Sequence, residues 1–68
     1  MAYVYILKSN KNEKFYIGST EDIVDRVKKH QAGHVYYTSR NLPVELVFQQ
    51  EYSDINIARR IEYKLKRL

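Results

Sequence analysis

The sequence has 68 residues, no cysteine, and twelve Lys and Arg against eight Asp and Glu, for a net charge of +4 at pH 7. A chain of this length buries only about 60% of the surface that its unfolded form exposes, so we expect residues 1–68 to form a single domain with a small core. The absence of cysteine excludes disulfides and thiolate zinc sites and fits a reducing cytoplasm. No apolar run approaches the roughly 18 residues that span a bilayer, and no signal-peptide pattern occurs, so we expect a cytoplasmic protein without a membrane partner.

The chain begins with two short runs rich in β-branched and aromatic residues, at residues 2–8 and 14–19, which predict two strands of a hairpin. If residues 10–13 form the turn, Ser9 faces Lys14, and the alternation of side chains then sorts the hairpin into two faces. One face is wholly apolar and is expected to be core: Val4, Ile6, Phe15 and Ile17. The other face places tyrosines beside a glycine: Tyr3, Tyr5, Leu7, Tyr16 and Gly18.

A helix is predicted next, because "STED" resembles a capping box with Ser19 as the N-cap and Asp22 three residues later. Its apolar stripe is formed by Ile23, Val24 and Val27. Gly33 is a plausible stop for this helix. The segment "HVYYTSRNLP", residues 34–43, reads as an irregular loop.

After Pro43, "VELVFQQEY" alternates well enough for a third strand, with Val44, Leu46 and Phe48 on one side. From Ser53 or Asp54 a second helix runs to the last residue without a C-cap, so we expect the domain to be truncated at its C-terminal end. The order strand, strand, helix, strand, helix predicts an α/β fold of the α+β type. In this fold a small three-stranded sheet is flanked by helices.

The tyrosines of the hairpin have a structural and a chemical interpretation. Cross-strand packing is the commoner reason to find Tyr5 and Tyr16, because a tyrosine acts as a base only where a cation or a metal-bound water lowers its pKa. Gly18 either satisfies a backbone requirement or leaves a gap through which a substrate backbone approaches. The residues alone leave both interpretations open.

The charged candidates are also ambiguous. Arg26 and His30 lie one turn apart on a helix flank, where Arg26 either pairs with Asp22 or offers its planar guanidinium to a phosphate, with His30 as a proton acceptor. Glu62 either pairs with Lys66 on the surface or binds a magnesium ion, which is often held by one or two protein carboxylates together with water and substrate phosphate. The net positive charge favours a polyanionic partner.

Together these residues resemble the GIY-YIG nuclease domain, and the resemblance covers essentially the whole chain. The matching positions are Tyr3-Val4-Tyr5, Tyr16-Ile17-Gly18, Arg26, His30 and Glu62. A "YT…P" segment, here Tyr37-Thr38 and Pro43, is similar to the small stand-alone bacterial branch, which also resembles the N-terminal domain of the excision-repair nuclease subunit. Tyr3 stands where the family usually has glycine.

The resemblance implies an endonuclease that hydrolyses phosphodiester bonds in DNA, in the repair or processing of branched or damaged DNA. By this analogy Tyr5 would activate the attacking water with help from His30, and Tyr16 would shape the same site. Arg26 would hold the scissile phosphate. Glu62 would hold one divalent ion, Mg²⁺ or Mn²⁺, while Gly18 would leave room for the substrate backbone. No organic cofactor is implied.

Two other functions stay open. Many nucleases of the family carry an asparagine in a further C-terminal segment that this sequence does not contain, so a non-cutting module that binds DNA or RNA is the alternative. A protein-interaction domain that uses Tyr36 and Tyr37 is the third. On charge and neighbourhood, the basic residues expected to touch nucleic-acid phosphates are Lys29, Arg40 and Arg59.

Overall fold

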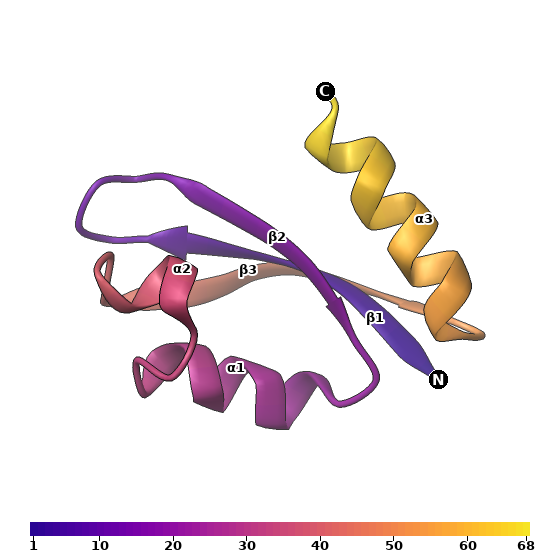
Figure 1. Ribbon diagram of the computed structural model, residues 1–68, viewed down its shortest axis with the longest axis horizontal. Coiled ribbons are helices and arrows are strands. Elements are labelled where there is room, and N and C mark those ends of the chain that lie inside the picture. Colours follow the sequence, from indigo (N-terminus) through magenta and orange to yellow (C-terminus); the bar gives the residue numbers. More distant parts are fainter.

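The computed structural model describes residues 1–68, apart from the side chain of Tyr37. The elements are β1 (Ala2–Ser9), β2 (Phe15–Thr20), α1 (Ile23–Gln31), α2 (Tyr36–Ser39), β3 (Val44–Tyr52) and α3 (Ile55–Lys66). The strands form an antiparallel sheet in the order β2-β1-β3 (Figure 1). The predicted α+β fold and its β-β-α-β-α order are therefore confirmed, with α2 as a short additional helix inside the segment predicted to be irregular.

The hairpin has the predicted register. The Ser9 amide donates to the Lys14 carbonyl at 2.9 Å, and Tyr5 lies directly opposite Gly18 in the β1–β2 ladder. Because β1 occupies the centre of the sheet, β2 and β3 are its two edges. The pair therefore joins the central strand, which carries Tyr5, to the edge strand β2, which carries Gly18.

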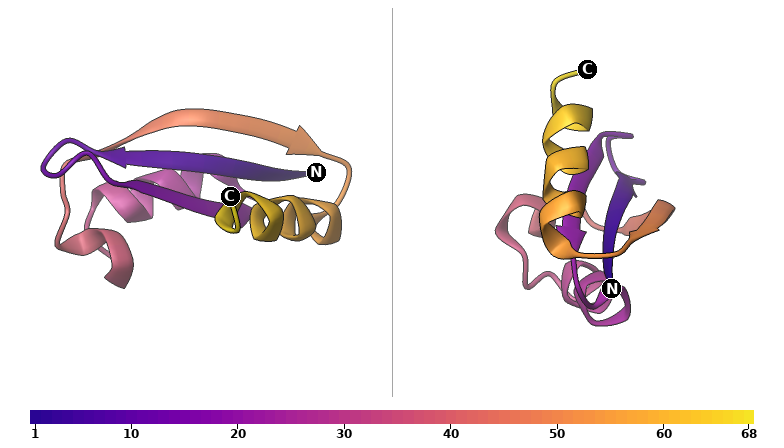
Figure 2. Two further views of the ribbon diagram at one scale, coloured as in Figure 1. Left: turned by 90° about the horizontal axis from the view of Figure 1, so that it is seen from above. Right: turned by 90° about the vertical axis from the view of Figure 1, so that its right-hand side faces the viewer.

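Helices cover both faces of the sheet, with α3 on one face and α1 on the other (Figure 2). Val4 and Ala58 belong to a buried cluster beneath α3, whereas Tyr5 and Leu7 belong to a second cluster on the α1 side. The apolar face is less well covered than the sequence predicts, since Phe15 on it is 62% exposed. The tyrosine face is core as well, because α1 and the segment after it close over it.

Strand β3 carries an irregularity that the alternation of its sequence conceals. Leu46 pairs with Leu7, but Phe48 pairs with Ile6, so Val47 is an extra residue in the β1–β3 ladder. One extra residue reverses the alternation of side chains. The prediction that Val44, Leu46 and Phe48 share a side is therefore wrong for Phe48, which lies 44% exposed on the other face.

Helix α1 begins three residues later than the capping box predicted. Asp22 is its N-cap and accepts a hydrogen bond from the Asp25 amide at 3.0 Å, while Ser19 remains in β2 opposite Val4. The helix ends at Gln31, and Gly33 follows with φ of 79°, a left-handed conformation that suits glycine. Asp54 is the N-cap of α3, as predicted.

None of the helices in the described part of the chain has both the length and the run of apolar residues that a bilayer-spanning helix requires.

Candidate active site

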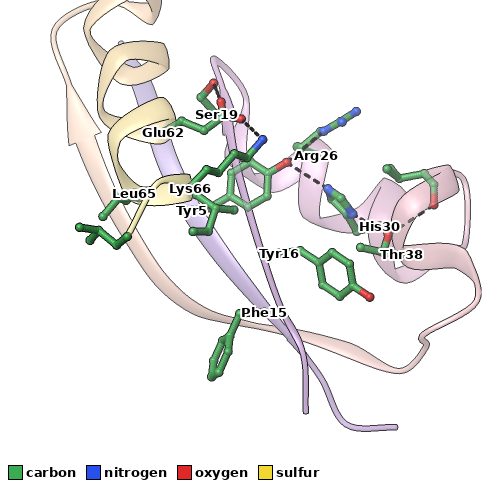
Figure 3. Close-up of a pocket in the computed structure, with 14 residues that line it drawn as sticks. Tyr5, Phe15, Tyr16, Ser19, Arg26, His30, Thr38, Glu62, Leu65 and Lys66 are labelled. Atoms are coloured by element: carbon green, nitrogen blue, oxygen red, sulfur yellow. Dashed lines mark hydrogen bonds and ion pairs between the residues drawn. The ribbon is translucent and has the colours of Figure 1, made fainter. Parts of the chain in front are cut away.

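A pocket of about 650 Å³ wraps around the edge of β2 and is reached by side chains from both faces of the sheet (Figure 3). It brings together the five residues predicted to carry chemistry: Tyr5, Tyr16, Arg26, His30 and Glu62. The pocket therefore unites one side chain from β1, one from β2, two from α1 and one from α3.

Tyr5 and His30 form the buried side of the pocket. The Tyr5 hydroxyl lies 3.0 Å from Nε2 of His30, and Nδ1 of His30 lies 2.7 Å from the hydroxyl oxygen of Thr38. All three residues are at most 4% exposed. Burial, reinforced by the positive charge of Arg26, lowers the pKa of His30 below its usual value. His30 is thus held neutral at pH 7, with a ring nitrogen available to the phenol.

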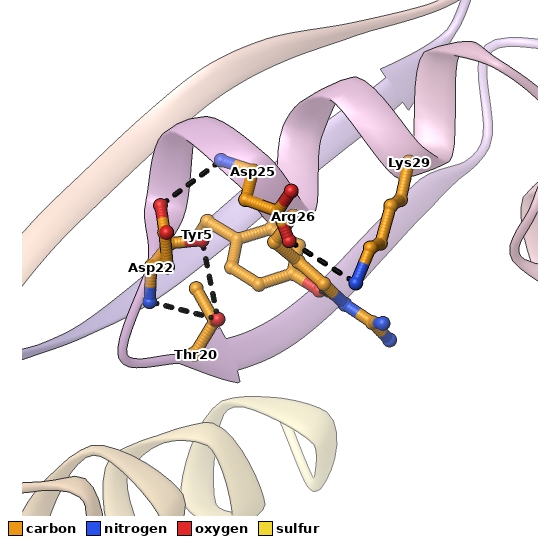
Figure 4. Close-up of polar contacts among 6 residues, drawn as sticks. All are labelled: Tyr5, Thr20, Asp22, Asp25, Arg26 and Lys29. Carbon is orange, nitrogen blue, oxygen red and sulfur yellow. Dashed lines mark hydrogen bonds and ion pairs between the residues drawn. The ribbon is translucent and has the colours of Figure 1, made fainter.

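Arg26 reaches the same hydroxyl from α1. Its Nε donates to the Tyr5 oxygen at 3.3 Å, and the rest of the guanidinium extends past that oxygen (Figure 4). The structure contains the contact to Tyr5 in place of the Asp22–Arg26 pair, since Asp22 caps the helix. The terminal nitrogens of a guanidinium form a fork that suits a phosphate.

Gly18 lines the pocket. A Cβ atom at this position would collide with the hydroxyl and ring carbons of Tyr5. The Tyr5 ring therefore occupies the space that a side chain at position 18 would need, while the approach of a substrate backbone past Gly18 stays a prediction. Glycine here allows the phenol to cross β2 and reach Arg26 and His30.

Glu62 enters the pocket from α3, with its side chain 20% exposed. Its Oε1 accepts a hydrogen bond from the Ser19 hydroxyl at 2.5 Å, and its Oε2 lies 2.6 Å from the Lys66 ammonium. Burial alone would raise the pKa of Glu62, but the hydrogen bonds from Lys66 and Ser19, with the charges of Lys66 and Arg59, outweigh it and lower the pKa. The carboxylate is thus ionised and forms an ion pair with the Lys66 ammonium.

The donor set fits a magnesium-like ion and does not fit a cage made by protein alone. The described residues contain no group of three or more His, Cys, Asp or Glu side chains able to hold a metal, and Glu62 is the one carboxylate among those that line the pocket. The Lys66 ammonium shows that Oε2 is placed to accept positive charge. An ion that takes most of its ligands from water and substrate phosphate needs only such a carboxylate.

The predicted phosphate-binding residues lie outside this pocket. Lys29 is paired with Asp25 at 3.1 Å (Figure 4), and Arg40 is exposed at the end of α2. Arg59 is exposed on α3, where its charge contributes to the lowered pKa of Glu62. They remain candidates for contacts with nucleic acid beyond the pocket.

Of the tyrosines proposed for protein interaction, Tyr36 is 77% exposed, whereas the side chain of Tyr37 lies outside the described part of the structure.

Three residues of the site were not predicted: Ser19, Thr38 and Lys66. The capping-box pattern predicts Ser19 as a helix cap, whereas the structure places it on β2 opposite Val4. Thr38 belongs to the "YT…P" segment of the family resemblance, but that segment has no periodicity that would place its hydroxyl beside His30. The pairing of Lys66 with Glu62 is confirmed, because it is one of the two interpretations that the four-residue spacing allows, but the spacing alone does not place Lys66 in the pocket.

The fold and the site define a class of protein. Residues 1–68 match the GIY-YIG catalytic domain over the full length of the sequence. The chain therefore belongs to the GIY-YIG family, in its branch of small bacterial UPF0213 proteins.

Individual relatives agree with this assignment. The chain is 40% identical over 65 residues to the UPF0213 protein of Staphylococcus haemolyticus, covering 94% of this chain and 78% of that protein. It is 37% identical over 67 residues to the UPF0213 protein YazA of Bacillus subtilis, covering 97% and 67% respectively. A solution NMR structure of a UPF0213 protein from Bacillus halodurans matches with a TM-score of 0.60 at 37% identity, covering all of this chain and 73% of that one.

Proposed function

We propose that this protein is a divalent-metal-dependent endonuclease that hydrolyses phosphodiester bonds in DNA, in the repair or processing of branched or damaged DNA. The observation that carries the proposal is the convergence of Tyr5, Arg26 and Glu62 on one pocket from different elements of the fold. Hydrolysis of a phosphodiester needs an activated water, positive charge at the phosphate, and help for the leaving oxygen. The pocket offers a candidate group for each requirement.

The Tyr5–His30 pair is placed to activate water. In the proposed step the phenol proton moves from Tyr5 to Nε2 of His30, and the resulting phenolate takes a proton from the attacking water. The water oxygen then forms a new bond to phosphorus. The bond from phosphorus to the leaving deoxyribose oxygen breaks, and that oxygen takes up a proton from solvent. Because His30 is neutral, its Nε2 is able to accept the proton, and the guanidinium of Arg26 lies at the phenol oxygen on which negative charge would develop.

Arg26 and Glu62 are proposed to hold the substrate from opposite sides of Tyr5. The free nitrogens of the Arg26 guanidinium would bind the non-bridging oxygens of the scissile phosphate and offset their charge. Glu62, oriented by Ser19, would hold the divalent ion, whose contribution when bound is Lewis-acid stabilisation of the leaving oxygen. Tyr16 lines the same pocket and would shape it.

The test is cleavage of nicked, branched, duplex and single-stranded DNA, and of RNA, with Mg²⁺, with Mn²⁺ and with EDTA. We expect metal-dependent cutting of DNA that falls by about 100-fold or more in Tyr5→Phe and is abolished in Glu62→Gln. Tyr63→Phe and Glu45→Gln are matched controls, because both residues are exposed and lie outside the pocket. Cleavage that survives both Tyr5→Phe and Glu62→Gln would refute this mechanism.

One observation favours a second function, a nucleic-acid-binding module that does not cut. Lys66 already occupies the Glu62 oxygen that a metal would need. If this pair persists with substrate, the pocket would present the cations of Arg26 and Lys66 to a phosphate without assembling a metal site. Salt-sensitive binding of DNA or RNA with no cleavage under any metal condition would support this function.

A further inference from the structure

The hydroxyl of Thr38 is an unassigned feature of the site. It is fully buried and lies 2.7 Å from the ring nitrogen of His30 that faces away from Tyr5. It also donates to the Val35 carbonyl at 3.4 Å. Thr38 lines the pocket. It does not contact the Tyr5 hydroxyl directly but contacts His30, which in turn contacts that hydroxyl.

The directions of these hydrogen bonds can be derived from what each group is able to donate. A hydroxyl has a single proton, and that of Thr38 is given to Val35, so its oxygen accepts from Nδ1 of His30. Nδ1 must then carry the imidazole proton. Since His30 is neutral, Nε2 has a lone pair and accepts from the Tyr5 hydroxyl.

The hydrogen bonds of the Tyr5 hydroxyl require the same tautomer of His30. The Tyr5 oxygen accepts from Nε of Arg26, and its own proton then has Nε2 of His30 as its acceptor. In the opposite tautomer, His30 would donate to the Tyr5 oxygen, and the buried phenol proton would have no acceptor among the described contacts of that group. A buried donor left without a partner loses its hydrogen bond to water and gains none in return, so this tautomer is disfavoured.

We infer that Thr38 is a positioning residue that fixes the tautomer of His30, keeping the proton on Nδ1 so that Nε2 is free to accept the proton of Tyr5. The inference rests on the proposed function for its kinetic consequence, since a histidine in the wrong tautomer is unable to take the phenol proton. The structural part, the tautomer itself, holds or fails without reference to any activity.

The first experiment is therefore a measurement of the tautomer, by long-range ¹H–¹⁵N correlation NMR on the ¹⁵N-histidine-labelled protein at neutral pH, without DNA or metal. We expect the His30 signals of the Nδ1–H tautomer. Thr38→Val, which keeps the shape and removes the acceptor, should shift His30 towards a mixture that includes the Nε2–H form. Thr38→Ser should retain the wild-type tautomer, and Ser39→Ala is the control, because the Ser39 hydroxyl bonds to Tyr36 and not to the histidine.

The second experiment is kinetic. Thr38→Val should lower kcat for DNA cleavage by roughly 10- to 100-fold, the usual cost of losing a group that orients a functional histidine, with little change in KM. Thr38→Ser should restore kcat, and Ser39→Ala should leave it unchanged. A loss that Thr38→Ser fails to rescue would mean that Thr38 acts through packing alone, and would overturn the inference.

The outcomes separate the two proposals. A wild-type spectrum with the proton on Nε2, or a Thr38→Val spectrum identical to wild type, overturns the inference even if the protein cuts DNA. The expected tautomers in a protein that cuts no substrate would support the positioning by Thr38 and refute the endonuclease. If Thr38→Val does not fold, the wild-type spectrum and Thr38→Ser still decide the tautomer.

Discussion

Tyr5 illustrates how tightly a single side chain of this site is held before any substrate arrives. Its hydroxyl accepts from Arg26 and contacts His30, its ring crosses over Gly18, and it is 3% exposed. A group fixed in this way loses little further rotational freedom when a reaction begins. Burial that resembles ordinary core packing is here also the means of orienting the phenol.

We therefore expect substitutions at position 18 to disturb the Tyr5 ring. Gly18→Ala would place a methyl group against the Tyr5 ring, and overpacking of this kind typically costs about 1–3 kcal/mol in the free energy of unfolding. We expect that loss in urea denaturation, together with a strong loss of DNA cleavage because Tyr5 is displaced. In a Tyr5→Leu background the same substitution should cost much less. Equal costs in the two backgrounds would show that Tyr5 is not what constrains position 18.

His30 should make stability depend on pH. Its pKa in the folded protein lies below the value of about 6.5 in an unfolded chain, so the unfolded state takes up the proton first as the pH falls. The contribution of neutral His30 is complete above about pH 6.5 and is lost as the pH drops through the lowered pKa. Urea unfolding between pH 8 and pH 5 should show wild type losing stability faster than His30→Gln. Parallel curves for the two proteins would contradict this prediction.

At the scale of elements, local patterns were sufficient wherever one segment decides the outcome. Alternation and a four-residue turn predicted the β1–β2 register, an apolar stripe predicted α1, and the capping residue Asp54 predicted the start of α3. The N-cap of α1 was placed too early, because Ser19 suits either a cap or a strand, and its pairing with Val4 decides between them. The extra residue at Val47 was not predictable, since a bulge depends on the partner strand.

The site shows the same division. Arg26 and His30 follow from their spacing on one helix, and the pair of Glu62 with Lys66 follows from their spacing on another. The bond between Tyr5 and His30 joins residues 25 positions apart in sequence, and the Ser19–Glu62 bond joins residues 43 apart, so no local pattern encodes either contact. Only the resemblance to the family predicts this convergence, because the residues alone leave it open.

In the last turns of α3, Lys66 and a divalent ion would compete for the Glu62 carboxylate. A divalent ion bound to Glu62 must displace the Lys66 ammonium from Oε2. We expect Lys66→Met to tighten Mn²⁺ binding by roughly two- to fivefold, the equivalent of losing a partly exposed ion pair of about 0.5–1 kcal/mol. The measurement is the broadening of the Ser19 and Glu62 amide NMR signals as Mn²⁺ is added to the DNA-free protein.

Lys64→Met is the matched control for this experiment, since Lys64 is exposed, lies in the same part of α3 and carries the same charge, but does not line the pocket. Equal Mn²⁺ affinities in the two variants would show that net charge, and not the pair with Glu62, governs access of the metal.

For the whole molecule, the net charge of +4 predicts binding to nucleic acid that depends on salt. Among the three predicted phosphate contacts, Arg59 should matter most, because its charge reaches Glu62, whereas Lys29 is already paired with Asp25. Arg59→Gln should lower the slope of log affinity against log salt concentration by about 0.9 for duplex DNA. Fluorescence anisotropy in EDTA measures this slope. A larger change in Lys29→Gln than in Arg59→Gln would reverse the assignment.

The two buried clusters described above support different residues of the candidate site. Glu62 rests with α3 on the cluster of Val4 and Ala58, whereas His30 rests with α1 on the cluster of Tyr5 and Leu7. Segments with separate support open with separate free energies. Warming that loosens α3 would draw the carboxylate away from an intact phenol–imidazole pair. Heat inactivation would then precede melting of the sheet, and the temperature range over which this protein works would be set by the attachment of one helix.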